Sequence, residues 1–151
     1  MRSRPVRREW RTDRTGHPTS VRHVESALAK AIDDKRFLPN LVLHEIEAWV
    51  LADCRRLGEL MGNRAPAAEL ERTVRLESGP ELVNDGVDTA PSKRIAKAYP
   101  QYAKTIDGPL VIADSGLNFI RSCCPHADDW LSEIGARMSR PPQGGATAQL
   151  K

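Results

Sequence analysis

Residues 41–51 read Leu-Val-Leu-His-Glu-Ile-Glu-Ala-Trp-Val-Leu, and the spacing of apolar residues changes within this stretch. Residues 37–43 form a short apolar run that suits a buried strand, with Pro39 marking an edge or entry position. From Glu45 onward, apolar residues recur at three- and four-residue spacing, which is typical of a helix. The stretch therefore predicts a strand that leads directly into a helix, as in an α/β fold.

The rest of the chain has a mostly helical pattern. Helical spacing predicts helices over residues 20–32, 45–61 with a break near Asp53, 65–76, 90–99 and from 125 to about 135. Residues 110–113 are a second apolar run, so we expect one or two strands. A strand needs a partner for its backbone hydrogen bonds, and none is apparent for residues 37–43. Either this segment is not a strand, or its partners lie outside the sequence.

Length and composition define the class of protein. The chain has 151 residues, of which 40% are hydrophobic and 28% charged, and this fits one folded domain. No stretch approaches the roughly 20 apolar residues of a membrane span, and no apolar segment follows the basic N-terminus as in a secretory signal. Three cysteines, two of them adjacent, make a poor disulfide framework. We therefore expect a cytoplasmic protein with no membrane contact.

The charge is unevenly distributed along the chain. Residues 1–22 carry seven arginines and two acidic residues, a local balance of +5 within a total of +3. Such a segment can contact nucleic-acid phosphates or can simply be solvated, and the presence of only one aromatic residue, Trp10, favours solvation. We divide the chain into a flexible basic leader at 1–19, a folded region at 20–135 and a disordered tail at 136–151.

The sharpest chemical feature of the sequence is His44-Glu45-Ile46-Glu47. A zinc protease would need a second histidine at position 48, where this chain has alanine. At the junction of a strand and a helix, Glu45 and Glu47 would lie at the carboxyl end of the strand, where α/β sheets bind ligands. Two carboxylates there suit Mg²⁺ or Mn²⁺, which prefer oxygen ligands. The alternative is that the carboxylates cap the helix and pair with arginine.

The segment Ser92-Lys93-Arg94 is a candidate for phosphate binding. It follows a proline at a predicted helix start, where backbone amides and adjacent cations can bind an anion. The alternative is an ordinary solvated helix face, since lysine and arginine pairs are common on protein surfaces.

Two further features are interpreted as structural. Asn84 and Asp85 precede a glycine, a pattern that is typical of a turn, with contact to the Lys93 region as the alternative. Trp49 and Trp130 lie on the apolar faces of predicted helices, so we expect both to be core residues.

Several separate blocks of the chain, in the same order, occur in one bacterial family. They are residues 37–39, 43–48, 83–86, 89–94, 108–110, 116–117 and 124–126, together with Lys104, Trp130 and Leu131. On these blocks, the chain from about Ser20 to Ile134 resembles domain-of-unknown-function family 4276. Because the blocks are several and ordered, the match is far more specific than any single motif.

The resemblance implies a Toprim-like α/β domain, in which acidic residues bind a divalent metal for phosphodiester chemistry. It also implies an ATPase partner of AAA or SMC type, as in phage-defence gene clusters. The family's first acidic strands precede the matched region and are not visible in residues 1–19. We therefore expect an N-terminally shortened member, the mostly helical C-terminal part of a Toprim-like domain with one or two strands.

Motifs and resemblance together predict a nuclease that uses Mg²⁺ or Mn²⁺, with little or no activity in this chain alone. The expected roles are His44, Glu45 and Glu47 in catalysis, Glu45 and Glu47 as metal ligands, and Ser92, Lys93 and Arg94 near phosphate. His44 would orient the site or carry a proton. The alternative function is a non-catalytic helical interaction module that docks on an ATPase and regulates it.

Overall fold

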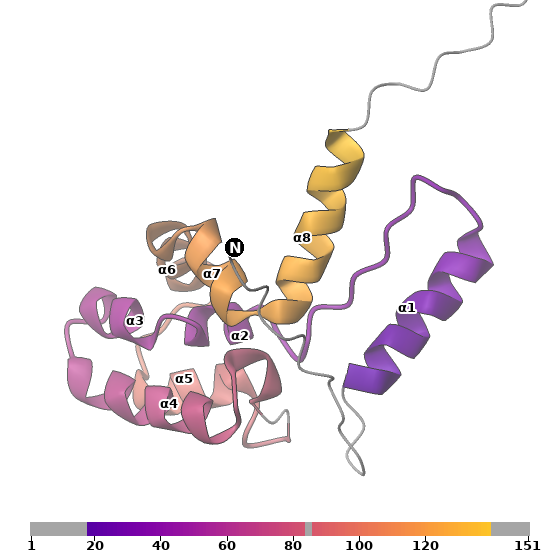
Figure 1. Cartoon of the computed structure of the whole chain (residues 1–151). Coiled ribbons are helices and arrows are strands. Elements are labelled where there is room, and N and C mark those ends of the chain that lie inside the picture. Colours follow the sequence, from indigo (N-terminus) through magenta and orange to yellow (C-terminus); the bar gives the residue numbers. More distant parts are fainter. Residues whose placement is uncertain (1–17, 84–85, 140–151) are drawn as a thin grey trace, which may run out of the picture.

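The computed structural model describes residues 18–83 and 86–139, and every regular element in these residues is a helix (Figure 1). The helices are α1 (Pro18–Ile32), α2 (Glu47–Leu51), α3 (Cys54–Leu60), α4 (Arg64–Leu76), the short 3-10 helix η1 (Pro80–Leu82), α5 (Pro91–Ala98), α6 (Asp107–Ser115), α7 (Leu117–Cys123) and α8 (Pro125–Met138). The expected predominance of helices is confirmed. None of these helices combines the length and apolarity needed to cross a membrane.

The strands predicted from the two apolar runs are wrong, because the described residues contain no strand. Residues 37–43 form an irregular segment between α1 and α8 (Figure 1). An apolar run becomes a strand only where a second strand supplies hydrogen bonds; here the amide of Leu41 donates instead to the Glu25 carboxylate (2.8 Å). Residues 110–113 lie inside α6, whose first turn accommodates Pro109 without loss of a hydrogen bond. The described chain is therefore helical rather than α/β.

Polar caps and prolines define helix boundaries that the sequence pattern indicated. The break near Asp53 separates α2 from α3, and the Asp53 carboxylate accepts a hydrogen bond from the N–H of Arg56 (3.1 Å). Asn63 caps α4 in the same way, accepting from the N–H of Ala65 (3.1 Å). A proline lies in the first turn of both α5 and α8. Because these residues pair or remove the amides that a helix leaves free at its start, the boundaries are encoded locally.

The main core lies among α2 to α6, where short helices share one set of buried side chains. Tyr99, at the end of α5, is the largest fully buried side chain of the set. The buried members are Val50, Leu51, Cys54, Leu57, Ala67, Leu70, Val83, Ile95, Tyr99 and Val111. Since every helix contributes only a few of them, none of these helices buries its apolar face alone.

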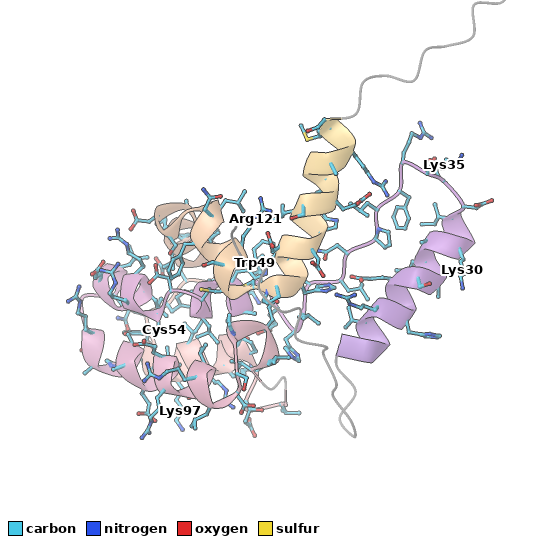
Figure 2. The ribbon with its side chains drawn as sticks, in the orientation of Figure 1. Lys30, Lys35, Trp49, Cys54, Lys97 and Arg121 are labelled. Carbon is cyan, nitrogen blue, oxygen red and sulfur yellow. The ribbon has the colours of Figure 1, made fainter. Side chains whose placement is uncertain are left out.

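A second, smaller cluster lies where α7 meets α8. Ile120, Cys124 and Ala127 are buried there, and Trp49 of α2 packs against them (Figure 2). α2 therefore connects the two clusters. Trp49 and Trp130, both expected in the core, are half-buried.

Helix α1 lies at the edge of the molecule, beside α8 (Figure 1). Polar contacts attach it: Arg22 pairs with Asp129 (2.8 Å), and Glu25 lies 3.0 Å from the His126 ring. The apolar stripe expected on this helix faces solvent. Its members Val24, Leu28 and Ile32 are 42%, 37% and 49% exposed.

Two helical glycines provide a matched test of close packing. A Cβ on Gly58 of α3 would lie 2.8 Å from the Cβ of Ala67 in α4, whereas one on Gly135 of α8 would meet nothing within 4 Å. We expect Gly58→Ala to destabilise the protein by about 1–3 kcal/mol, because α3 and α4 must move apart. Gly135→Ala should stabilise it by about 0.5–1 kcal/mol through helix propensity. Urea unfolding measures both, and a neutral Gly58→Ala would contradict the close approach.

Candidate functional site

The candidate site begins at the turn between the irregular segment and α2. His44 has a φ of +62°, a left-handed conformation that is uncommon for residues with a side chain. The N–H of Glu45 donates to the carbonyl of Leu43 (2.8 Å), and the Glu45 carbonyl accepts from the N–H of Ala48 (3.0 Å). This sharp turn directs Glu45 toward α5 and leaves Glu47, the first residue of α2, in the interior.

Glu45 caps the N-terminus of α5. Its Oε2 accepts a hydrogen bond from the N–H of Ser92 (2.8 Å), and its Oε1 accepts one from the Ser92 hydroxyl (2.9 Å). Burial opposes ionisation, but the hydrogen bonds from Ser92 and the charge of Lys104 outweigh it, so the pKa of Glu45 lies below its ordinary 4.5. Glu45 therefore caps a helix, but this helix is α5 and not the one that Glu45 precedes, and its cation is Lys104 and not an arginine.

Glu47 is fully buried, and the cation that it contacts among the described residues is Lys104. The Lys104 ammonium lies 2.9 Å from Glu47 Oε2 and 3.7 Å from Glu45 Oε1, so it bridges the two carboxylates. The contact with Glu47, above all, raises the pKa of Lys104 and keeps it charged. Apart from this ion pair, neither carboxylate oxygen of Glu47 has a hydrogen-bond partner in the described part of the chain. Lys104 therefore supplies one positive charge to two carboxylates, and the described residues leave hydrogen-bonding capacity of Glu47 unused.

Tyr102 belongs to the same cluster. Its hydroxyl is buried and has no hydrogen-bond partner among the described residues. A Cβ on Gly108 would lie 2.8 Å from this hydroxyl, so a glycine at position 108 leaves room for the Tyr102 hydroxyl. Burial, and then the charge of Glu47, raise the pKa of Tyr102, and the phenol remains a donor. Because buried polar groups are nearly always paired, the Tyr102 hydroxyl and the Glu47 carboxylate are each candidates for a hydrogen bond to water or to a ligand.

The two carboxylates, Glu45 and Glu47, are the residues expected to hold a divalent cation, and the structure brings both near Lys104. Glu45 and Glu47 both approach one ammonium group, at 3.7 and 2.9 Å, so the two carboxylates face the same position. Within residues 18–83 and 86–139, no group of three or more His, Cys, Asp or Glu side chains could hold a metal ion. Mg²⁺ commonly uses one or two carboxylates and completes its coordination with water and substrate phosphate. The pair is compatible with that kind of site and not with a cage made of protein ligands.

The three residues expected near phosphate have different surroundings. Ser92 is engaged by Glu45 through both its amide and its hydroxyl, so the amide that could bind an anion is occupied. Lys93 is exposed on α5. Arg94 is half-buried, and its Nε donates to the carbonyl of Thr89 (2.7 Å), which holds the loop before α5. Of the two cations, Lys93 is thus the more exposed.

Of the residues interpreted as structural, Asn84 and Asp85 lie outside the described residues.

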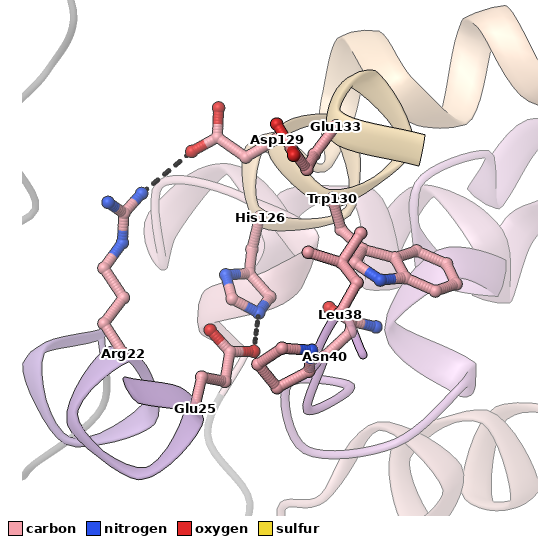
Figure 3. A pocket seen from close by; sticks show the side chains of 9 residues that line it. Arg22, Glu25, Leu38, Asn40, His126, Asp129, Trp130 and Glu133 are labelled. Carbon is pink, nitrogen blue, oxygen red and sulfur yellow. Dashed lines mark hydrogen bonds and ion pairs between the residues drawn. The ribbon is translucent and has the colours of Figure 1, made fainter. Parts of the chain in front are cut away.

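Trp130 lines a groove of about 330 Å³ between α1, residues 38–40 and α8 (Figure 3). The groove is lined by Arg22, Glu25, Leu38, Pro39, Asn40, His126, Asp129, Trp130 and Glu133. Two pairs of its polar groups contact each other, Arg22 with Asp129 and Glu25 with His126 (Figure 3). Asn40 Oδ1 and Trp130 Nε1 are buried without a hydrogen-bond partner among the described residues. The structural role expected of Trp130 stays a prediction.

Sequence reasoning assigned no role to Lys104 and Tyr102, although both lie at the candidate site. Lys104 occurs among the blocks that carry the family resemblance, which was the available signal. No spacing rule relates it to Glu47, which is 57 positions earlier by number (104 − 47). Tyr102 precedes Lys104 by two residues in the turn between α5 and α6, so one turn supplies both side chains.

A family model described as Domain of unknown function (DUF4276) matches residues 7–135. The match ends where we expected the folded region to end, and it begins within the segment 1–19 that we separated as a leader. No curated protein and no solved structure matches the chain. Because the model covers most of the chain and the whole candidate site, the chain belongs to the DUF4276 family.

Proposed function

We propose that this protein binds Mg²⁺ or Mn²⁺ through Glu45 and Glu47 and cleaves nucleic-acid phosphodiesters. The observation that supports the proposal is the convergence of both carboxylates on one cationic position, 2.9 and 3.7 Å from the Lys104 ammonium. The family resemblance, which implies acidic residues that bind a divalent metal for phosphodiester chemistry, points to the same chemistry. It also adds an ATPase of AAA or SMC type as the partner in phage defence.

The residues around the pair have distinct tasks in this proposal. A divalent cation held there would neutralise phosphate charge and activate a bound water as the nucleophile. Ser92 fixes the orientation of Glu45, and burial fixes Glu47, so neither carboxylate must be ordered when the cation binds. His44 would orient the pair or carry a proton, and Lys93 would contact substrate phosphate.

Thermal unfolding with and without metal tests the binding step. At a Mn²⁺ concentration ten times Kd, binding should stabilise the full chain by about 1.4 kcal/mol, a rise in Tm of about 3–6 °C. The double variant Glu45→Gln/Glu47→Gln should lose this rise. Glu69→Gln/Glu71→Gln is the matched control, because these exposed glutamates of α4 have the same spacing and the same change of charge. A rise that survives in the first variant would place the metal elsewhere.

A cleavage assay tests the chemistry. Wild type and the control pair of substitutions should cleave DNA or RNA slowly and only with Mg²⁺ or Mn²⁺, because two carboxylates leave most of the coordination to water and substrate. Glu45→Gln/Glu47→Gln should be inactive. Metal-dependent cleavage by that variant would refute the assignment of the two glutamates.

The second candidate function is an interaction module that docks on an ATPase of AAA or SMC type and regulates it. The exposed apolar stripe of α1, with Val24, Leu28 and Ile32 turned to solvent, favours this alternative. It predicts neither stabilisation by Mn²⁺ nor cleavage by the wild-type chain, together with a changed rate of ATP hydrolysis by the ATPase. The metal and cleavage assays therefore separate the two functions.

A further inference from the structure

Lys104 reaches the candidate site from the surface. Its side chain is 51% exposed, whereas Glu47, which its ammonium touches at 2.9 Å, is fully buried. It belongs to the turn between α5 and α6, not to either helix. A lysine has a flexible four-carbon stem and a compact charge, so a half-exposed one can leave its partner without disturbing a helix.

An ammonium group satisfies this site only in part. It lies at hydrogen-bond distance from Glu47 but at 3.7 Å from Glu45, and an oxygen of Glu47 and the Tyr102 hydroxyl remain without hydrogen bonds. A hydrated divalent cation carries twice the charge, and its bound waters can donate to and accept from such orphaned groups. The unmet hydrogen bonding of fully buried Glu47 is an observation separate from the clustering of the carboxylates.

The two cations compete for the same carboxylates. A divalent ion seated between Glu45 and Glu47 would repel an ammonium that lies about 3–4 Å from both, so Lys104 must turn outward. An anionic phosphate bound near the metal would stabilise the displaced ammonium. Metal and phosphate ligand would then raise each other's affinity by the same factor, as linkage requires.

We propose that Lys104 is the resident counter-ion of the Glu45–Glu47 pair, which a divalent cation must displace, and that its displacement couples metal binding to the binding of a phosphate-bearing ligand. This inference rests on the proposed function, because it takes Glu45 and Glu47 as metal ligands. Lys104 is a positioning residue in this scheme: without substrate it keeps metal affinity low, and with substrate it moves to the anion.

Free Mn²⁺ measured by electron paramagnetic resonance, in titrations of the full chain, tests the proposal without any measurement of cleavage. We expect Lys104→Met to bind Mn²⁺ about tenfold more tightly than wild type, and its Tm to rise more with the ion. Lys104→Arg, which keeps the charge, should bind no more tightly than wild type. Lys97→Met removes a lysine on the outer face of α5 (Figure 2) and should have no effect.

A second arm adds a short single-stranded DNA oligonucleotide. The oligonucleotide should tighten Mn²⁺ binding several-fold in wild type and much less in Lys104→Met, because no ammonium remains to be displaced. Equal Mn²⁺ affinity in wild type and Lys104→Met, with binding still lost in Glu45→Gln/Glu47→Gln, would overturn the role of Lys104 and leave the proposed function standing. Absence of Mn²⁺ binding in every variant would overturn both. If Lys104→Met does not fold, Lys104→Gln, which keeps a polar end, replaces it with the same expected result.

Discussion

Replacing Tyr99 with alanine is expected to lower the free energy of unfolding by about 3–5 kcal/mol, the range for deletion of a large buried aromatic side chain. Tyr99 is 2% exposed and is the largest fully buried side chain of the core. It lies at the end of α5, and its hydroxyl donates a hydrogen bond to the carbonyl of Asn63 at the start of α4 (2.6 Å). Its loss would leave a cavity and remove a hydrogen bond where α5 meets α4.

The variant Tyr99→Phe separates these two contributions. It keeps the ring and removes only the hydrogen bond, so the expected loss is about 1–2 kcal/mol. Urea unfolding followed by circular dichroism measures both variants. If Tyr99→Phe costs as much as Tyr99→Ala, the hydrogen bond to Asn63 and not the packing of the ring would dominate.

Glu81→Ala is the second substitution with a large expected effect, a loss of about 2–4 kcal/mol. Glu81 is only 2% exposed, and its carboxylate accepts hydrogen bonds from the N–H groups of His126 (2.9 Å) and Ala127 (3.1 Å). These are two of the amides that α8 leaves free at its start, so the substitution by alanine would remove their hydrogen-bond acceptor. Urea unfolding at neutral pH measures the loss, and Glu69→Ala, at an exposed position of α4, should change little.

The same residue predicts a pH dependence. Burial, opposed by the hydrogen bonds from His126 and Ala127, raises the pKa of Glu81 above its ordinary 4.5. The folded protein therefore resists ionisation of this carboxyl more than the unfolded chain does, and stability falls as pH rises from about 4.5 through the raised pKa. The glutamine of Glu81→Gln does not titrate. The free energy of unfolding of wild type should therefore fall relative to that of Glu81→Gln as the pH rises over this range. A difference that is constant with pH would contradict the raised pKa.

Much of the candidate site could be predicted from local sequence. Glu45 and Glu47 stand out because two carboxylates flank the point where the apolar pattern changes, and Ser92 because it follows a proline at a helix start. That Ser92 binds Glu45 rather than an anion could not be predicted, since 47 residues separate them. The role of Lys104 could not be predicted for the same reason, because it depends on which turn packs against α2.

The sequence by itself determined where α3, α4, α5 and α8 begin, because caps such as Asp53 and Asn63 and the prolines of α5 and α8 act within one turn. It also determined the family, through ordered blocks. Only the tertiary structure decided the state of residues 37–43, because a strand exists only if a second strand pairs with it, and pairing is not a local property. It likewise decided that one cation, Lys104, bridges Glu45 and Glu47, because which charges meet in the interior depends on how helices pack.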